Sequence, residues 1–308
     1  MSGHDVVGLG VATIDIVTLV DHLPAEEEIE PALDLALQGG GPVATAIVTL
    51  ARLGARTAML DAVGEDWRGN LILEDFAAAG VETAYIVRRK ACTTATACLF
   101  VCHGTGSRTI VFLPGTTPDL TPEELPRPVI EGARFLHLNG RHLEACLQAC
   151  HWGRRAGVQI SFDGGADRYR PEMRQLVPLS DICIVARDFA EKYTQEPGVE
   201  AQARTLLAEG PRLVAITDGI RGSWVFSRQG PSFHQPAFRV PNVVDTTGCG
   251  DAYHGAFLFG LLKGMDLEKT AALASATAAL NAQHLGGRRG LPALTAVEDF
   301  LLAHQDNG

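Results

Sequence analysis

The strongest signal in this sequence is the stretch Asp245-Thr246-Thr247-Gly248-Cys249-Gly250-Asp251-Ala252-Tyr253-His254-Gly255-Ala256-Phe257. Two apolar residues, Val243 and Val244, precede it, and the segment from Ala252 to Lys263 has the apolar spacing of a helix. The pattern therefore predicts a buried strand, a tight glycine turn and a helix. The first N–H groups of a helix have no intrahelical acceptor, and the glycines would let a ligand approach them closely. We expect an anion-binding site at this turn.

Asp251 places a carboxylate in the mouth of this turn. An acid at a helix start is often only a cap or a partner of the helix dipole, worth about 1 kcal/mol. The alternative is a general base, which takes a proton from a substrate hydroxyl while the helix N–H groups stabilise a transferring phosphoryl group. The glycine turn favours the general base. Cys249 is interpreted as a small spacer rather than a nucleophile.

Composition limits the classes of protein to consider. The 308 residues are 46% hydrophobic and carry a formal net charge of −10, which suits one large domain over residues 1–308 and argues against a nucleic-acid-binding surface. The seven cysteines have neither zinc-site nor redox spacing, so we expect reduced thiols. The sequence shows no targeting signal or membrane-length apolar run, so we expect a cytoplasmic protein without a membrane partner.

Strands and helices alternate along most of the chain. Predicted strands include 6–11, 57–63, 135–138, 158–163, 182–185, 213–217 and 224–226, and predicted helices include 43–53, 70–79, 143–156, 202–208 and 267–283. This order predicts an α/β fold with a parallel sheet wrapped on both faces. Two β-like segments interrupt the pattern, at about 16–38 and 93–114, and they predict a small β lid.

Several segments lie where predicted strands end, which is the usual ligand edge of an open α/β sheet. Asp15 follows the first strand, although an ordinary turn residue is an equally simple interpretation. The glycines at 39–41 precede a helix that starts near Pro42, and they permit either a substrate against the backbone or a sharp turn. The segment Gly8-Leu9-Gly10 lacks the third glycine of a dinucleotide-binding fingerprint, so a nicotinamide-dependent oxidoreductase is disfavoured.

Four sequence blocks occur in a fixed order along the chain. They are Gly40-Gly41 with the helix end Ala51-Arg52-Leu53-Gly54; Val63-Gly64-Glu65-Asp66 with Gly69; Thr217 with Gly219 and Gly222; and the segment 245–251. These blocks resemble the signatures of the ribokinase-like (PfkB) family of carbohydrate kinases over nearly the whole chain, with Cys249 in place of the usual Ala. The resemblance implies a three-layer α/β/α sandwich with a mostly parallel central sheet and a small β lid.

The resemblance also implies an ATP-dependent kinase that phosphorylates a primary hydroxyl of a small ribose-, fructose- or ketose-like sugar, with magnesium accompanying ATP. Asp251 would be the base, and the N–H groups of Gly248, Cys249 and Gly250 would hold the phosphoryl group. Sugar-binding residues would be Thr13, Asp15, Gly40, Gly41, Thr45 and Arg141. Nucleotide-binding residues would be Thr217, Gly219, Gly222, Thr246, Ala274 and Ala278. Asp245 and Thr247 match a monovalent-cation site of many members, so potassium is a further candidate ligand.

Two positions depart from the family pattern. Thr45 stands where an Asn usually contacts the substrate. The family's Asn-x-x-Glu block, which is tied to magnesium, is missing near Ala186-Arg187-Asp188-Phe189, so the sequence assigns no magnesium ligands. Asp188 and Glu191 are water-mediated substitutes at best.

The substrate class stays open in three respects. The segments 39–45 and 286–292 are more similar to the sulfofructose kinase branch, which binds an anionic sugar. No Lys or Arg occurs from Ile14 to Leu50, however, and anion binding generally needs a charge-assisted donor, so we favour a neutral sugar and keep a sulfo- or phosphosugar open through Arg108 and Arg141. Nucleosides and a non-catalytic sugar-binding role on the same scaffold are further alternatives.

Exposed strand edges in the lid predict a homodimer.

Overall fold

The central layer of the protein is a sheet whose inner strands are buried on both faces. In the computed structural model, which describes residues 3–305, its strands are β1 (Val6–Leu9), β4 (Thr57–Gly64), β5 (Ile86–Arg89), β8 (Phe135–Leu138), β9 (Gln159–Gly164), β10 (Ile182–Ala186), β11 (Leu213–Thr217), β12 (Ser223–Ser227) and β13 (Phe233–Gln235). They lie in the order β13-β12-β11-β10-β9-β8-β1-β4-β5. Neighbours from β5 to β11 pair in parallel, whereas β12 and β13 are antiparallel. The predicted mostly parallel sheet is confirmed.

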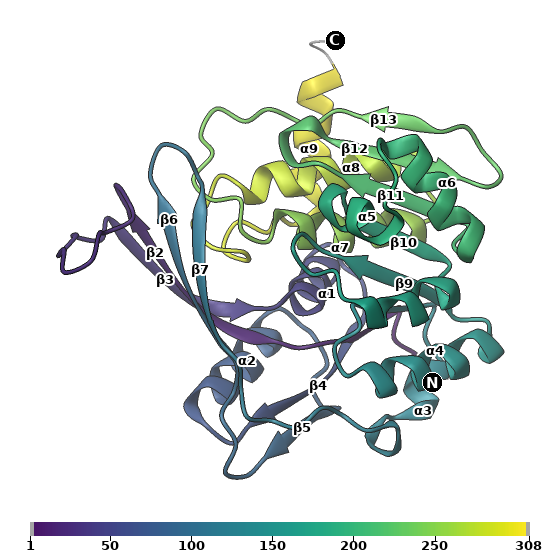
Figure 1. Ribbon diagram of the computed structural model, residues 1–308, viewed down its shortest axis with the longest axis horizontal. Coiled ribbons are helices and arrows are strands. Elements are labelled where there is room, and N and C mark those ends of the chain that lie inside the picture. Colours follow the sequence, from purple (N-terminus) through teal and green to yellow (C-terminus); the bar gives the residue numbers. More distant parts are fainter. Residues whose placement is uncertain (1–2, 306–308) are drawn as a thin grey trace.

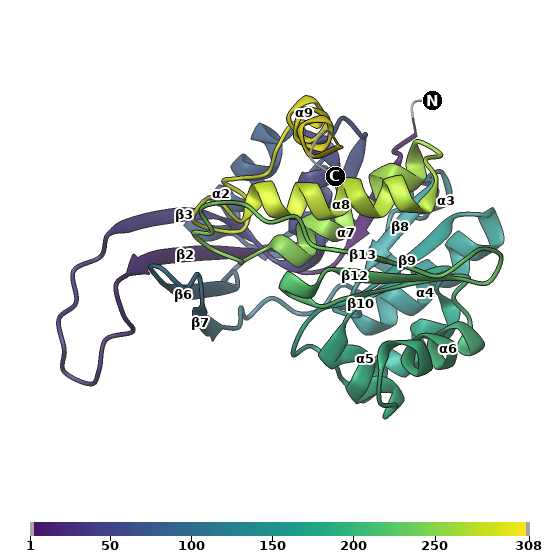
Figure 2. The ribbon, with the colours of Figure 1, turned by 90° about the horizontal axis from the view of Figure 1, so that it is seen from above.

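Helices cover both faces of this sheet (Figure 2). One face carries α1 (Pro42–Arg52), α2 (Trp67–Ala78), α7 (Cys249–Leu262), α8 (Leu267–Asn281) and α9 (Leu294–Gln305). The other carries α3 (Arg127–Glu131), α4 (Leu143–Ala156), α5 (Arg187–Thr194) and α6 (Val199–Glu209). Within β1, Val6 packs with the first set and Val7 with the second, which is why the strand reads as a continuous apolar run. The three-layer sandwich is confirmed.

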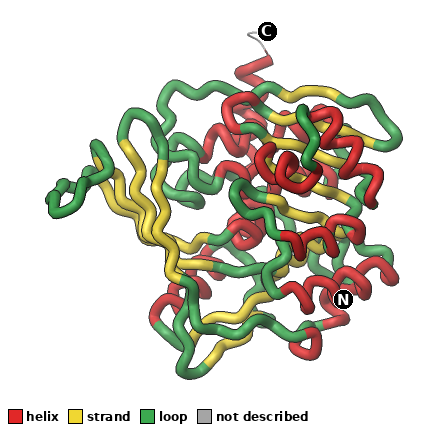
Figure 3. The backbone as a smooth tube through the Cα atoms, viewed as in Figure 1, coloured by secondary structure: helices red, strands yellow, loops and turns green. Residues whose placement is uncertain are grey.

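A second, four-stranded sheet projects from one end of the sandwich (Figures 1 and 3). We call it the lid; it consists of β2 (Thr13–Val20), β3 (Asp34–Gly40), β6 (Thr96–Cys102) and β7 (Arg108–Leu113), in the order β3-β2-β6-β7. Val17, Leu99 and Val101 form a small apolar cluster with Leu285, which anchors the lid to the body. The edge strand β7 is exposed along its whole length.

The segment before α7 differs from the prediction. Val243 and Val244 form no strand, because the sheet ends at β13 and leaves them no neighbouring strand; instead the Val244 N–H donates to the carbonyl of Ala282 at 2.9 Å. Helix α7 also begins earlier than predicted, at Cys249 rather than Ala252. The predicted order of strand, turn and helix is therefore wrong in its first element.

The sequence also left several elements unpredicted, among them β5, α5 and α9. Over residues 3–305, no helix combines the length and apolar character needed to cross a bilayer.

Candidate active site

The glycine turn before α7 leaves open space at the N-terminus of the helix. Gly248 has φ of 70°, and a Cβ on it would lie 2.6 Å from the carbonyl oxygen of Gly287, so backbone geometry and packing both require glycine. Gly250 is different, because a Cβ there would meet no atom of the described chain within 4 Å. Protein packing therefore does not explain the second glycine, whereas a ligand lying against the backbone would.

The carboxylate of Asp245 fixes the shape of this turn. It is fully buried, and its two oxygens accept the N–H groups of Thr247 and Gly286, each at 2.8 Å. Asn281 adds a bond from its side-chain amide to the carbonyl of Gly287 at 3.1 Å. The Thr247 hydroxyl is buried without a hydrogen-bond partner among the described residues, so its oxygen is available to the predicted cation.

Asp251 lies in the first turn of α7 and is partly exposed. Burial of the carboxyl raises its pKa, and the neighbouring charge of Asp163 raises it further, against smaller opposing effects of Arg168, His254 and Arg108. A carboxylate with a raised pKa is a stronger base than a free one. Cys249 is not activated in this way, because burial raises the pKa of its thiol to about 12.

Asp15 lies on β2, where the lid joins the body. Burial raises the pKa of its carboxyl, and the charge of Asp251 is among the further causes, so the two carboxyl groups share one electrostatic environment. Thr13 donates a hydrogen bond to Asp15 at 2.7 Å. A Cβ on Gly40 would lie 2.1 Å from the Asp15 carboxylate, so only glycine leaves space for that side chain. Gly41 has φ of 91°, and a Cβ on it would lie 2.2 Å from a backbone oxygen, so this position also requires glycine.

The lid reaches the glycine turn before α7 through Arg108 on β7. Its guanidinium donates to the Thr246 hydroxyl at 3.0 Å, and that hydroxyl also lies 3.4 Å from the carbonyl of Gly106. The contact joins residues 138 positions apart in the sequence. Of the two arginines proposed for an anionic sugar, Arg108 therefore lies at the turn.

The predicted nucleotide loop follows β11 and enters the short helix η4 (Gly219–Arg221). Gly222 has φ of 89°, and a Cβ there would lie 2.1 Å from a backbone oxygen, whereas Gly219 faces open space. Thr217 lies at the end of β11. On α8, Ala274 is fully buried and Ala278 is partly exposed, so only Ala278 has surface available for an adenine.

Two predicted sugar-binding residues are placed differently from the rest. Arg141 lines a separate hollow of about 200 Å³ together with Asp119, His142 and Arg170, among others. Thr45 is buried, and its hydroxyl accepts a hydrogen bond from Arg288 at 3.1 Å. The structure thus groups Thr13, Asp15, Gly40 and Gly41 with each other, and gives Thr45 a partner within the protein.

Arg288 is a buried residue that the sequence patterns did not single out. Only 4% of its side chain is exposed, and the guanidinium contacts Asp75 of α2, Thr45 of α1 and the carbonyl of Gly40 at 2.8 Å. It also stacks over the ring of Phe76. These partners lie more than 200 positions away in the sequence, so local pattern offers no signal for the role of Arg288.

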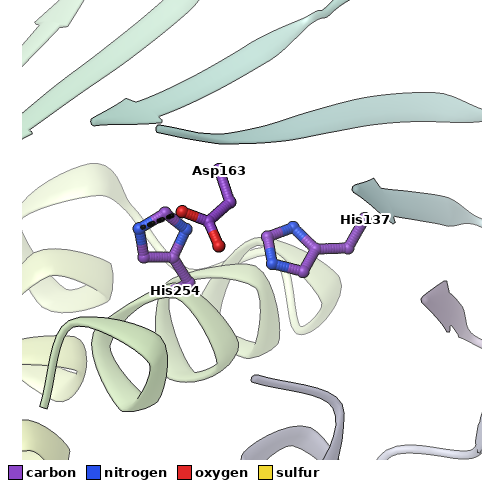
Figure 4. A group of neighbouring side chains, drawn as sticks. All are labelled: His137, Asp163 and His254. Carbon is purple, nitrogen blue, oxygen red and sulfur yellow. Dashed lines mark ion pairs between the residues drawn. The ribbon is translucent and has the colours of Figure 1, made fainter. Parts of the chain in front are cut away.

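A buried cluster of His137, Asp163 and His254 was also missed (Figure 4). Asp163 could have been noticed, because it ends a predicted strand just as the other ligand-edge residues do. Burial lowers the pKa of His137 to about 3 and that of His254 to about 4, and it raises the pKa of Asp163. Both imidazoles are therefore neutral at pH 7.

Comparison with known proteins places the chain in a family. The model of the pfkB family carbohydrate kinases matches residues 4–294. Ketohexokinase of Mus musculus is 25% identical, with 87% of this chain and 93% of the relative covered, and ribokinase of Staphylococcus aureus is 29% identical, with 96% and 98% covered. An Escherichia coli protein whose structure holds ATP and Mg²⁺ superposes with a TM-score of 0.86 at 22% identity, covering 98% of this chain and all of that one.

The fold and the glycine turn thus define a kinase of the ribokinase type, a phosphotransferase with an alcohol group as acceptor. The chain belongs to the pfkB family of carbohydrate kinases, as its sequence blocks predicted.

Replacing the buried arginine tests its part in joining the body to the lid. We expect Arg288→Met to lower the free energy of unfolding by about 3 kcal/mol, since it leaves Asp75 and the Gly40 carbonyl without their donor. The matched control is Arg289→Met, whose ion pair with Asp34 is about half exposed and should change stability by less than about 0.5 kcal/mol. Urea unfolding of both variants provides the measurement, and equal losses would contradict this role.

Proposed function

We propose that this protein, acting as one kinase domain with a β lid, transfers the γ-phosphoryl group of ATP to a primary hydroxyl of a small neutral sugar. The observation that carries the proposal is the position of Asp251: a carboxylate of raised pKa in the first turn of α7, beside Gly250 and the open space in front of it. The names of the similar kinases, ketohexokinase and ribokinase, support a sugar of this size.

Asp251 acts on the sugar hydroxyl as general base. Its carboxylate accepts the hydroxyl proton as the oxygen attacks phosphorus, and its raised pKa makes that transfer more favourable. The N–H groups of Gly248, Cys249 and Gly250 stabilise charge on the phosphoryl oxygens. The Cys249 N–H contributes least, because it already points to the carbonyl of Thr246 at 3.4 Å.

Asp15, with Thr13, Gly40 and Gly41, binds hydroxyls of the sugar in this proposal. The buried Asp15 carboxylate keeps acceptor capacity beyond its bond to Thr13, and a sugar hydroxyl is a suitable donor. Thr45 acts indirectly, since its hydroxyl holds Arg288 beside the Gly40 carbonyl.

ATP lies against Thr217, Gly219, Gly222, Thr246 and Ala278 in this proposal, and Ala274 supports the helix from within the core. Mg²⁺ accompanies the nucleotide, as in the Escherichia coli structure. The segment that replaces the Asn-x-x-Glu block does not fit a direct magnesium site. Arg187 is paired there with Asp218 at 2.8 Å, and Asp188 already accepts the N–H of Asp167 at 2.7 Å. Mg²⁺ would then be held chiefly by the phosphates and water.

An anionic sugar is the second candidate, and the position of Arg108 favours it. The guanidinium lies at the turn, bonded only to the neutral hydroxyl of Thr246 among its described hydrogen bonds. It is thereby available for a sulfonate or phosphate. Arg141, in its separate hollow, gives this candidate no comparable support.

Removing the proposed base should separate catalysis from folding. We expect Asp251→Asn to lower kcat by about 100- to 10,000-fold while the melting temperature and ATP binding stay close to wild type, because only proton acceptance is lost. Cys249→Ala, in the same turn, should retain near-normal kcat because its thiol is not ionised. Steady-state kinetics of both variants, with the sugar that gives the wild type its highest kcat/KM, provides the measurement. Near-normal turnover of Asp251→Asn would refute the role of the base.

A thermal-shift screen should identify the substrate class. With a non-hydrolysable ATP analogue present, we expect neutral sugars to raise the melting temperature more than sulfosugars, phosphosugars or nucleosides, since binding to the folded state alone stabilises it. Asp15→Asn should lose the sugar-dependent shift, whereas Asp251→Asn should keep most of it. A shift with only anionic sugars would transfer the assignment to the second candidate.

We also propose a homodimer formed through the lid. Strand β7 is an edge strand with four consecutive exposed apolar residues, Ile110 to Leu113, and β3 at the other edge exposes Leu35 and Leu37. Exposed apolar edges of this kind are usually covered.

Light scattering should therefore give twice the chain mass of 32.8 kDa. The double variant Ile110→Glu/Val111→Glu should be monomeric, because adjacent residues of a strand point to opposite faces and one charge would enter the contact whichever face is used. Leu302→Glu, an exposed position on α9, is the control and should remain dimeric. A monomeric wild type would contradict the proposal.

A further inference from the structure

The cluster of His137, Asp163 and His254 brings two imidazoles and a carboxylate together inside the protein. They come from the end of β8, the end of β9 and the first turns of α7, and Figure 4 shows the Asp163 carboxylate between the two rings. One donor atom from each residue lies within 4.8 Å of the others, and the His254 Nε2 to Asp163 Oδ1 distance is 3.7 Å. Each residue is at least 97% buried.

Four nitrogen and oxygen atoms of this cluster lack the hydrogen bonds that buried polar groups normally make. Both oxygens of Asp163, the Nε2 of His137 and the Nδ1 of His254 have no partner among the described residues. Burying a carboxylate without a partner is costly, and such groups usually indicate an ion or water bound between them. A water molecule can supply hydrogen bonds, and a bound cation would in addition compensate the charge of the ionised Asp163 carboxylate.

Ser161 lies beside one of the two imidazoles and can fix its orientation. Its hydroxyl lies 3.1 Å from Nδ1 of His137. When Nδ1–H donates to that oxygen, the lone pair of Nε2 is directed at the cluster. Histidines that bind metals almost always use their second ring nitrogen for such an orienting hydrogen bond.

We propose that His137, Asp163 and His254 form a binding site for a divalent transition-metal ion of the zinc class, separate from the magnesium that accompanies ATP. Two nitrogens and one carboxylate oxygen are the donor set of many zinc sites with an open fourth position, whereas Mg²⁺ prefers oxygen ligands alone. Metal–ligand bonds of about 2.0–2.1 Å place the ligand atoms of a tetrahedral site about 3.3 Å apart. The distance of 3.7 Å between His254 Nε2 and Asp163 Oδ1 needs only a small contraction to reach this spacing. His254 follows Asp251 by three residues, so the ion would lie within one helical turn of the proposed base.

Cobalt(II) is the probe for this site because its visible absorption reports nitrogen ligation and low coordination number. We expect the metal-free full-length protein, without nucleotide or magnesium, to bind one Co²⁺ with intense bands that a large excess of Mg²⁺ does not remove. His137→Gln and His254→Gln should each weaken binding at least about 100-fold, and Ser161→Ala about 10-fold, because the last removes only the orienting hydrogen bond. Ser161→Ala is the mildest change, so it keeps the test valid if a histidine variant fails to fold.

The exposed group of His22, Glu28 and Glu30 supplies the control, since its donor atoms are also close enough to bind a metal. His22→Gln should leave the Co²⁺ bands and affinity unchanged. The proposal is overturned if the wild type develops no bands, if Mg²⁺ displaces the cobalt, or if His22→Gln abolishes binding while Ser161→Ala and His137→Gln retain it.

Discussion

The geometry of the candidate active site depends on the hydrogen bonds of the buried Asp245 carboxylate. Irregular segments have no strand or helix ladder to satisfy their N–H groups, and buried groups of this kind must find another acceptor. Asp245 supplies two acceptors, one to the turn before α7 and one to Gly286, 41 positions further on. Because the two segments are thereby held as one piece, Gly248 can pack against Gly287, and the N-terminus of α7 opens toward solvent rather than into the protein.

Arg288 connects the loop that Asp245 holds to the base of the lid. A guanidinium is planar and presents several donors in fixed directions, so one side chain can bond to groups from different elements at once. Here those groups belong to α1, α2 and the end of β3, and the residue itself follows the loop that Asp245 fixes. The backbone at Gly40, against which the Asp15 carboxylate packs, is thus tied to the same loop as the glycine turn. The segments proposed to bind the sugar and the phosphoryl group are therefore held by the same loop.

The fold could be predicted because its signals are local. Continuous apolar runs mark strands covered on both faces, and the spacing of glycines marks the start of α7. The errors arose where tertiary contacts decide the outcome. Val243 and Val244 have strand composition but no strand beside them, and Arg288 and the His137 cluster depend on partners brought together only by the sheet. The hydrogen bond between the Thr45 hydroxyl and Arg288, 243 positions away, is likewise a contact that no pattern within α1 reveals.

The charges of the candidate site support the proposal that an alcohol and a phosphoryl group bind in adjoining places. Burial raises the pKa of Asp15, Asp163 and Asp251, and the three share the weak influence of the exposed Arg168. In the proposed function, the Asp15 and Asp251 carboxylates can each accept a further hydrogen bond, and a sugar hydroxyl would provide it at little electrostatic cost. A few residues away the situation is the opposite: the N-terminus of α7 and Arg108 present hydrogen-bond donors and have no anion to accept from them among the described residues. Phosphoryl transfer requires a proton acceptor and an anion-stabilising surface side by side, and the groups proposed for these two roles both lie in the first turn of α7.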